Sequence, residues 1–255
     1  MSIGGLKTKS PMPLPYTELD FRQTDMGDLI LRRRTIATLD GLEVLEVKLG
    51  DGFLMSSLFH VVEEALATLG LAALSKPSDL SIVVGGLGLG YTAAAVLDDP
   101  RVSSLHVIEF MPAVIDWHQT GLIPLGARLI ADPHCHLVLA DFFALAADPV
   151  TGFDPQKPAR TFDAILLDID HSPDNLLHQR HAPFYTPAGL RQLAAQLTPT
   201  GIFAMWSDDP PEASFTSALQ EVFTSVTSHI VTFPNPILEK NSASTVYIAH
   251  NTSPS

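Results

Sequence analysis

The chain has 255 residues, of which 46% are apolar, with a formal net charge of −13 and a single cysteine, Cys135. A chain of this length and apolar content can bury a full core. Its negative charge disfavours nucleic acid or an anionic membrane as a partner, and one cysteine excludes an intramolecular disulfide. The sequence shows neither a recognisable signal peptide nor an apolar run of membrane-spanning length, so we expect a cytoplasmic protein.

The first part of the chain predicts a flexible arm followed by a small β domain. Residues 1–16 contain three prolines and little periodicity, which is typical of an arm. Residues 17–56 contain strand-like segments such as Leu42–Leu49, separated by the turn-forming pairs Asp40-Gly41 and Asp51-Gly52. We expect a small antiparallel domain of two β-hairpins here.

The remainder, residues 57–255, alternates between strand-like and helix-like segments. The expected strands are Leu80–Val84, Leu105–Phe110, Leu137–Asp141, Phe162–Asp168, Gly201–Trp206 and a terminal antiparallel pair, Val226–Phe233 and Thr245–Ala249. Helices are expected after Ser57, over Tyr91–Leu97, from Pro112, over Thr186–Leu197 and over Pro211–Thr224. This order predicts an α/β domain with a doubly wound, mostly parallel seven-stranded sheet.

A glycine-rich loop follows the first strand of this sheet. Its glycines are Gly85, Gly86, Gly88 and Gly90. Backbone N–H groups can approach a ligand closely in such a loop, although a tight turn without a ligand has the same pattern. Glu109 closes the next strand, nineteen residues after Gly90, where an acid can accept hydrogen bonds from ribose hydroxyls. We therefore expect a ligand that contains a nucleoside.

Two further strands end in acidic residues. Asp141 suits the exocyclic amine of a base, and Phe142 would offer a stacking face; N-capping of the next helix is the alternative for Asp141. Asp168 ends the fourth strand. Because the carboxyl ends of parallel strands form the ligand-binding edge of such sheets, we expect both acids near the glycine loop.

The segment Asp168–His181 concentrates acids and histidines. His171 is a candidate general base because histidine titrates near neutrality, and Asp170 could orient it or act itself. A solvated loop whose polar residues cap helices is one alternative. A zinc, iron or manganese site is another, but the spacing matches no standard ligand motif, so we expect no metal.

Residues at the same edge of the sheet suit a pocket for a small, cationic acceptor. The candidates are Asp174, Tyr185, Trp206 and Asp208. Core packing is the alternative for both aromatic residues, and for Trp206 it is the favoured one. The sequence leaves a homo-oligomer open.

These motifs resemble the spermidine synthase family, a branch of the class I S-adenosylmethionine-dependent methyltransferase (Rossmann-like) fold. The resemblance extends from about residue 28 to residue 249. The segments that carry it are Val83–Gly90, Val107–Ile115, Ala140-Asp141 and Phe162–Asp168. The resemblance implies S-adenosylmethionine, or its decarboxylated form, as the donor substrate.

The resemblance also implies a role for each matching residue. Gly86, Gly88 and Gly90 would pass close to the amino-acid part and the ribose of the donor. Glu109 would hold the ribose and Asp141 the adenine amine. Asp168 would stand at the reacting end.

The chain departs from the family at three places. Spermidine synthases carry an aspartate in the glycine loop, which helps to hold the aminopropyl amine of the decarboxylated donor, whereas Gly85–Gly90 contains no acid. They also carry a catalytic aspartate three residues after the one that matches Asp168, where this chain has His171. The tyrosine-histidine-glutamate signature near the first helix is absent, and Phe59–Glu63 resembles it only weakly.

These departures favour methyl transfer to a small amine or hydroxyl acceptor. Aminopropyl transfer to a diamine, as in polyamine synthesis, is the alternative. A non-catalytic nucleoside-binding scaffold of the same fold is a second alternative.

Overall fold

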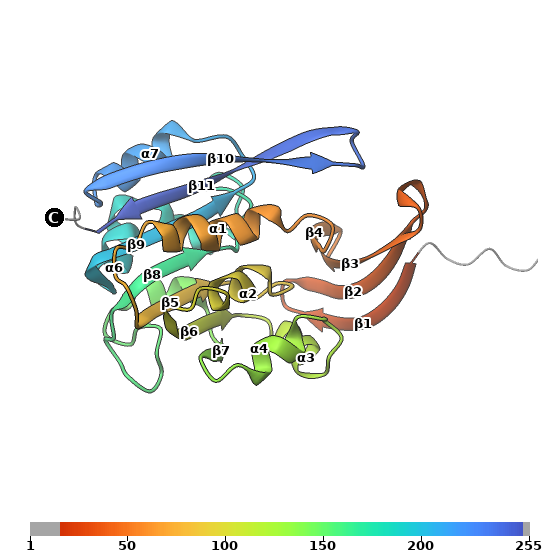
Figure 1. The fold of residues 1–255 in the computed structure, drawn as a ribbon, viewed down its shortest axis with the longest axis horizontal. Coiled ribbons are helices and arrows are strands. Elements are labelled where there is room, and N and C mark those ends of the chain that lie inside the picture. Colours follow the sequence, from red (N-terminus) through yellow and green to blue (C-terminus); the bar gives the residue numbers. More distant parts are fainter. Residues whose placement is uncertain (1–15, 252–255) are drawn as a thin grey trace, which may run out of the picture. The chain divides into compact units, whose positions relative to one another are not determined.

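The computed structural model describes residues 16–251. The predicted N-terminal arm, residues 1–16, therefore lies almost entirely outside the described residues. The chain divides into an N-terminal unit that ends at Leu58 and a larger unit that begins at Phe59, and each is considered by itself (Figure 1).

The N-terminal unit is a four-stranded antiparallel sheet. Its strands, in spatial order, are β1 (Tyr16–Thr24), β2 (Gly27–Ile36), β3 (Leu42–Leu49) and β4 (Gly52–Ser56). A short 3-10 turn, η1 (Ala37–Leu39), joins β2 to β3, and the predicted turn follows it with positive φ at both Asp40 and Gly41. Strand β1 was not predicted, because most of its residues are exposed and its sequence lacks apolar alternation,.

The larger unit contains the predicted doubly wound sheet. Its strands are β5 (Leu80–Gly85), β6 (Val102–Glu109), β7 (Cys135–Leu139), β8 (Phe162–Leu167), β9 (Leu197–Ser207), β10 (Ser225–Asn235) and β11 (Lys240–His250). Their spatial order is β10-β11-β9-β8-β5-β6-β7. Strands β5 to β9 are parallel, and β11 runs antiparallel to both β9 and β10. The predicted fold class is confirmed.

Helices cover this sheet. They are α1 (Val61–Ala72), α2 (Tyr91–Leu97), α3 (Pro112–Gln119), α4 (Gly126–Ala131), α5 (Phe142–Ala146), α6 (Pro187–Ala194) and α7 (Ala213–Gln220), with a 3-10 segment η2 (Gln179–Tyr185). Helices α1 and α2 pack against each other (Figure 1). Within the described residues, no helix is both long enough and apolar enough to cross a membrane.

Both faces of the central strands are buried. A Cβ atom on Gly70 of α1 would lie 3.0 Å from Leu166 and 3.6 Å from Ala204, so these two side chains face α1. Successive strand residues point to opposite faces, and Leu167 accordingly joins a buried cluster with side chains from α5, α6 and α7. This two-sided burial explains why Phe162–Leu167 is nearly continuous in apolar residues,.

Strands β10 and β11 form a long hairpin at one edge of the sheet (Figure 1). Residues Ser225–Asn235 pair along their whole length with Lys240–His250. Only Thr245–His250 also pairs with β9. The half of the hairpin nearest its turn is therefore a two-stranded ribbon within the described structure.

Candidate active site

The order of the strands reverses between β5 and β8, which are neighbours at the centre of the sheet. Ligands of doubly wound sheets bind outside the carboxyl ends of the strands at such a point. The glycine loop follows β5, Asp168 follows β8 and Glu109 ends β6. The Asp168 N–H donates to the carbonyl oxygen of Gly85 at 2.9 Å. The structure thus brings these predicted site residues to one place.

Close packing and backbone conformation require glycine in the loop. Gly86, Gly88 and Gly90 have φ angles of 95°, 50° and 92°, values that side-chain-bearing residues adopt with strain. A Cβ atom on Gly86 would lie 2.2 Å from the carbonyl oxygen of Asp168. Glycine at this position therefore allows the β5 loop to lie directly against the end of β8.

Glu109 joins the glycine loop to the end of β6. Its side chain is buried, with 6% exposure. Oε2 accepts the N–H of Leu87 at 3.0 Å, and Oε1 accepts the N–H of Met111 at 2.7 Å. Burial raises the pKa of Glu109, and the backbone donors oppose that shift. The backbone N–H groups of Gly88 and Phe110 also act on this carboxylate, so Glu109 is surrounded by donors at the end of β6.

Asp168 lies beside a second carboxylate that the sequence did not single out as a site residue. The Thr92 hydroxyl, in the first turn of α2, donates to Asp168 Oδ2 at 2.8 Å. The second carboxyl group belongs to Glu63 of α1. Burial raises the pKa of Glu63, and the nearby negative charge of Asp168 raises it further. Burial also raises the pKa of Asp168, and the Thr92 bond partly offsets this. The weak resemblance of Phe59–Glu63 to the family signature was the feature of the sequence that could have pointed to Glu63.

Asp170 organises the segment that follows β8. Its buried carboxylate accepts the Tyr185 hydroxyl at 2.8 Å and the Leu177 N–H at 2.7 Å. It also lies 2.9 Å from His181 Nδ1. Asp170 therefore holds His181, and not His171 as predicted. We call Asp170, Leu177, His181 and Tyr185 the Asp170 clamp.

His171 lies with two of the predicted acceptor-pocket residues. The Asp208 N–H donates to the His171 carbonyl oxygen at 2.7 Å, which ties the end of β9 to the loop after β8. The His171 ring lies edge-on to the Trp206 ring, with 6.4 Å between centroids. Both rings are partly exposed, and Asp208 is exposed. Asp174, further along the loop, is also exposed.

Two aromatic predictions need correction. The Phe142 ring is buried in the core, stacked on Phe153 at 5.1 Å and facing Gly85, so it offers no stacking face to a base. Tyr185 belongs to the Asp170 clamp, and its ring packs edge-on against Phe184 and Phe215. Burial and then the charge of Asp170 raise the pKa of Tyr185 well above its ordinary value, so it remains a hydrogen-bond donor.

Asp141 is the N-cap of α5, which was the alternative for this residue. Its Oδ1 accepts the N–H groups of Phe143 and Ala144 at 3.0 and 3.3 Å. Its Oδ2 lies 3.6 Å from the Arg180 guanidinium, which also lies 4.7 Å from the centroid of the exposed Phe110 ring. The sequence did not single out Arg180 or Phe110, which are far apart in the chain.

The metal alternative receives no support from side-chain geometry. No group of three or more His, Cys, Asp or Glu side chains in the described residues is arranged to hold a metal ion. His171 and His181, the two histidines of interest after β8, belong to different local networks.

Comparison with known structures identifies the fold. A spermidine synthase in complex with the transition state analogue AdoDATO superposes with a TM-score of 0.68 at 18% identity, over 92% of this chain and 73% of that chain. Spermidine synthase from Thermotoga maritima gives a TM-score of 0.67 at 16% identity, over 92% and 72%. The fold is that of the spermidine synthases. This spermidine synthase-like fold is the one that the sequence motifs predicted.

The same fold is related to class I methyltransferases. Human methyltransferase-like protein 13 in complex with SAH has a TM-score of 0.55 at 18% identity, over 75% of this chain and 82% of that chain. At this identity the likeness shows that the two chains share a fold.

Sequence comparison finds both a methyltransferase and an aminopropyltransferase among the relatives. An eEF1A lysine and N-terminal methyltransferase from Danio rerio is 29% identical over 157 residues, 60% of this chain and 21% of the relative. A polyamine aminopropyltransferase from Mycobacterium tuberculosis is 28% identical over 133 residues, 51% of this chain and 23% of the relative. The chain thus spans about a fifth of the length of these curated relatives. No protein-family model matches it.

Proposed function

We propose that this chain is a transferase that uses an S-adenosylmethionine-type sulfonium donor. The observation that carries the proposal is the convergence of the glycine loop, Glu109 and Asp168 where the strand order reverses. Proteins of the same fold are described in complex with AdoDATO and with SAH, which supports a donor of this kind.

The donor would lie across the carboxyl ends of β5, β6 and β8. Glu109 would accept hydrogen bonds from the ribose hydroxyls, beside the backbone N–H groups that already act on its carboxylate. Asp141 Oδ2, which is not used in capping α5, would accept from the exocyclic amine of the base. Asp168, held by Thr92, would face the ammonium group at the reacting end.

We further propose methyl transfer to a small nucleophile. The bond from sulfur to the methyl carbon breaks as a bond from that carbon to an acceptor nitrogen or oxygen forms, and the donor leaves as a neutral thioether. The acceptor proton passes to the His171 imidazole, which lies beside Trp206,. A sulfonium methyl is already activated, so alignment of donor and acceptor is the main task of the protein.

The glycine loop supports the intact donor over its decarboxylated form. Residues Gly85–Gly90 contain no acid, so no side chain of the loop repels a donor carboxylate or pairs with a lone donor ammonium. One observation favours aminopropyl transfer as a second candidate: Glu63 places a second carboxyl group beside Asp168. The ammonium group of a decarboxylated donor bound beside the two would favour their ionised forms.

Calorimetric titration with S-adenosylmethionine, its decarboxylated form and the thioether product tests the proposal. We expect S-adenosylmethionine to bind at least about tenfold more tightly than the decarboxylated donor, or about 1.4 kcal/mol. The Gly88→Asp variant should narrow that preference, because it restores an acid to the loop. A preference for the decarboxylated donor would favour aminopropyl transfer. Binding of none of the three would refute the transferase proposal and favour the non-catalytic scaffold.

A further inference from the structure

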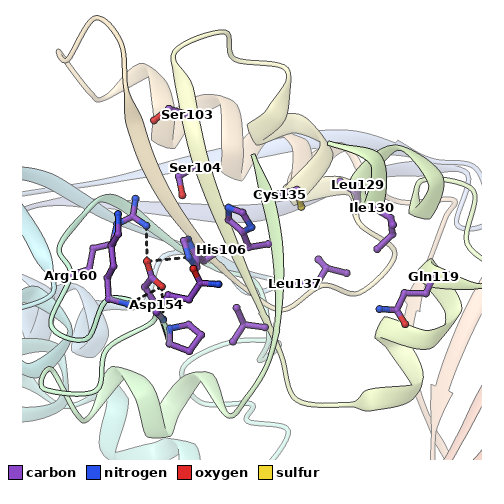
Figure 2. Close-up of a pocket in the computed structure, with 15 residues that line it drawn as sticks. Ser103, Ser104, His106, Gln119, Leu129, Ile130, Cys135, Leu137, Asp154 and Arg160 are labelled. Atoms are coloured by element: carbon purple, nitrogen blue, oxygen red, sulfur yellow. Dashed lines mark hydrogen bonds and ion pairs between the residues drawn. The ribbon is translucent and has the colours of Figure 1, made fainter. Parts of the chain in front are cut away.

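A pocket of the larger unit lies away from the candidate active site. It is a pocket of about 690 Å³ over the amino-terminal half of β6 and along β7. Residues of helix α4 and of the loop between α5 and β8 also line it, as Figure 2 shows. His106, which lines it, precedes Glu109 by three residues and therefore lies about 10 Å from it along the strand. A pocket of this volume is large enough for a small metabolite.

His106 lines this pocket and carries an unused hydrogen-bond acceptor. The residue is 5% exposed, and its Nε2 lies 3.5 Å from Asp154 Oδ2. A carboxylate only accepts hydrogen bonds, so Nε2 carries the proton and Nδ1 carries a lone pair. Nδ1 is buried and has no hydrogen-bond partner among the residues that the structure describes. Burial lowers the pKa of His106 to about 4, so Nδ1 remains an acceptor at neutral pH.

The same part of the pocket carries an excess of positive charge. Arg160 donates to Asp154 Oδ2 at 2.8 Å and to the Ser81 hydroxyl at 2.7 Å, which fixes its guanidinium on the wall. Lys157 also lines the pocket, and its ammonium group forms no ion pair within residues 16–251. Two cations therefore face one carboxylate, in a chain whose formal net charge is −13.

The opposite end of the pocket is less polar. Figure 2 shows Leu129, Ile130 and Leu137 on the side away from Arg160. A ligand that spans the pocket would place a charged group near Arg160 and Lys157 and a carbon skeleton towards Leu137. Hydroxyl groups along that skeleton would supply the donor that His106 Nδ1 lacks.

We propose that this pocket binds a small polyhydroxylated anion, with its phosphate or carboxylate towards Lys157 and Arg160 and one hydroxyl donating to His106 Nδ1. This site is separate from the donor site and does not depend on the proposed transferase activity. Leu129 connects the two places, because it lines the pocket and a Cβ atom on Gly90 would lie 2.9 Å from its Cδ1.

The test is a titration of the whole chain with glucose 6-phosphate, gluconate and glucose, in separate experiments. The NMR signals of the histidine rings report binding. We expect at least one of the two anions to shift the His106 signals saturably, and glucose to bind at least about tenfold more weakly because it lacks the charged group. The tighter of the two anions identifies the charged group that the pocket prefers. Binding of neither anion, or equal binding of glucose, overturns the proposal.

Variants separate this site from unspecific attraction of anions. Lys157→Gln should weaken binding at least about fivefold, the scale of one lost charge-assisted contact. Lys240→Gln removes the same charge from the distant hairpin and should leave the affinity within about twofold, since surface charges this far apart are screened. His106→Leu should weaken binding, whereas His106→Asn keeps an acceptor and should retain more of it. Equal effects of Lys157→Gln and Lys240→Gln would refute the site.

Discussion

Glu109 is the residue through which β6 holds the glycine loop, since its two oxygens take the N–H groups of Leu87 and Met111. We predict that Glu109→Ala weakens binding of the sulfonium donor by about 1.5–3 kcal/mol, the range for hydrogen bonds to a charged group. Calorimetry measures the loss. Glu109→Gln is the matched control, because it keeps one acceptor oxygen and should lose less. Unchanged affinity in a folded Glu109→Ala variant would refute the site.

His171 is the proposed acceptor of the substrate proton, which it can take only as a neutral imidazole. Once an acceptor is identified, we predict that turnover rises with pH through the range in which a histidine loses its proton. His171→Ala should remove that limb of the pH–rate profile. The exposed histidine of β10, His229, is the control, and its replacement by alanine should leave the limb in place. A limb that persists in His171→Ala would assign the proton to another base.

Residue types at strand ends predicted part of this site, and neighbours distant in the chain explain the rest. Glu109 and Asp168 were predictable because strand–loop–strand order places acids beside a glycine loop. Glu63 was not, since only the packing of α1 over the sheet brings it to Asp168. The role of Phe142 was wrong because an aromatic residue after a strand points either to a ligand or to the core, and here it packs beneath Gly85.

At the scale of elements, the segment between β8 and α6 is held by one carboxylate. Asp170 accepts from Leu177, His181 and Tyr185, which lie on successive parts of that segment. We predict that Asp170→Asn speeds amide hydrogen exchange over residues 171–186 by about 10- to 100-fold. This corresponds to about 1.4–2.7 kcal/mol, the scale of lost hydrogen bonds to a charged group. Exchange in β8 should change little.

Asp174→Asn is the matched control for the Asp170 clamp. Asp174 lies in the same segment but is exposed, so removing its charge should leave exchange within about threefold of the parent, as for most surface substitutions. Equal acceleration in the two variants would show that total charge, and not the clamp, orders this segment.

The elements themselves were predictable to different degrees for physical reasons. Strand β8 is buried on both faces, so its continuous apolar sequence identified it. Strand β1 has polar residues on both sides, so its sequence lacks the apolar alternation that would predict a strand. Its pairing with β2 holds it in the extended conformation. Helix α5 was foreseen only as the alternative use of Asp141, since five residues are too few for a helical period to show.

At the scale of the whole molecule, Glu63 and Asp168 link stability to pH. A carboxyl whose pKa is raised on folding keeps its proton in the folded state where the unfolded chain has already released it. The stabilisation is complete below the ordinary value of 4.5 for Glu63 and is lost as pH rises towards the folded-state value. The free energy of unfolding should therefore fall as pH rises from about 5 towards 8, through this pair.

The variant Glu63→Gln isolates that contribution. We predict that its unfolding free energy, relative to the parent chain, improves by about 1–2 kcal/mol between pH 5 and pH 8, since one pKa unit corresponds to about 1.4 kcal/mol. Denaturant unfolding at the two pH values measures it. Glu221→Gln, at an exposed position of the same unit, should show no such trend. A flat difference between Glu63→Gln and the parent would contradict the raised pKa of Glu63, which burial and then the charge of Asp168 produce.

The long hairpin of β10 and β11 has a consequence for how the chain can be divided. Ile237 and Leu238 lie exposed in its turn, beyond the part of β11 that pairs with β9. A backbone break there would leave every strand intact. The carboxyl-terminal piece would supply β11, which is an inner strand between β9 and β10 (Figure 1). Two separately expressed fragments should therefore reassemble by strand insertion, which would make the protein a candidate for a split reporter whose folding depends on the meeting of two partners.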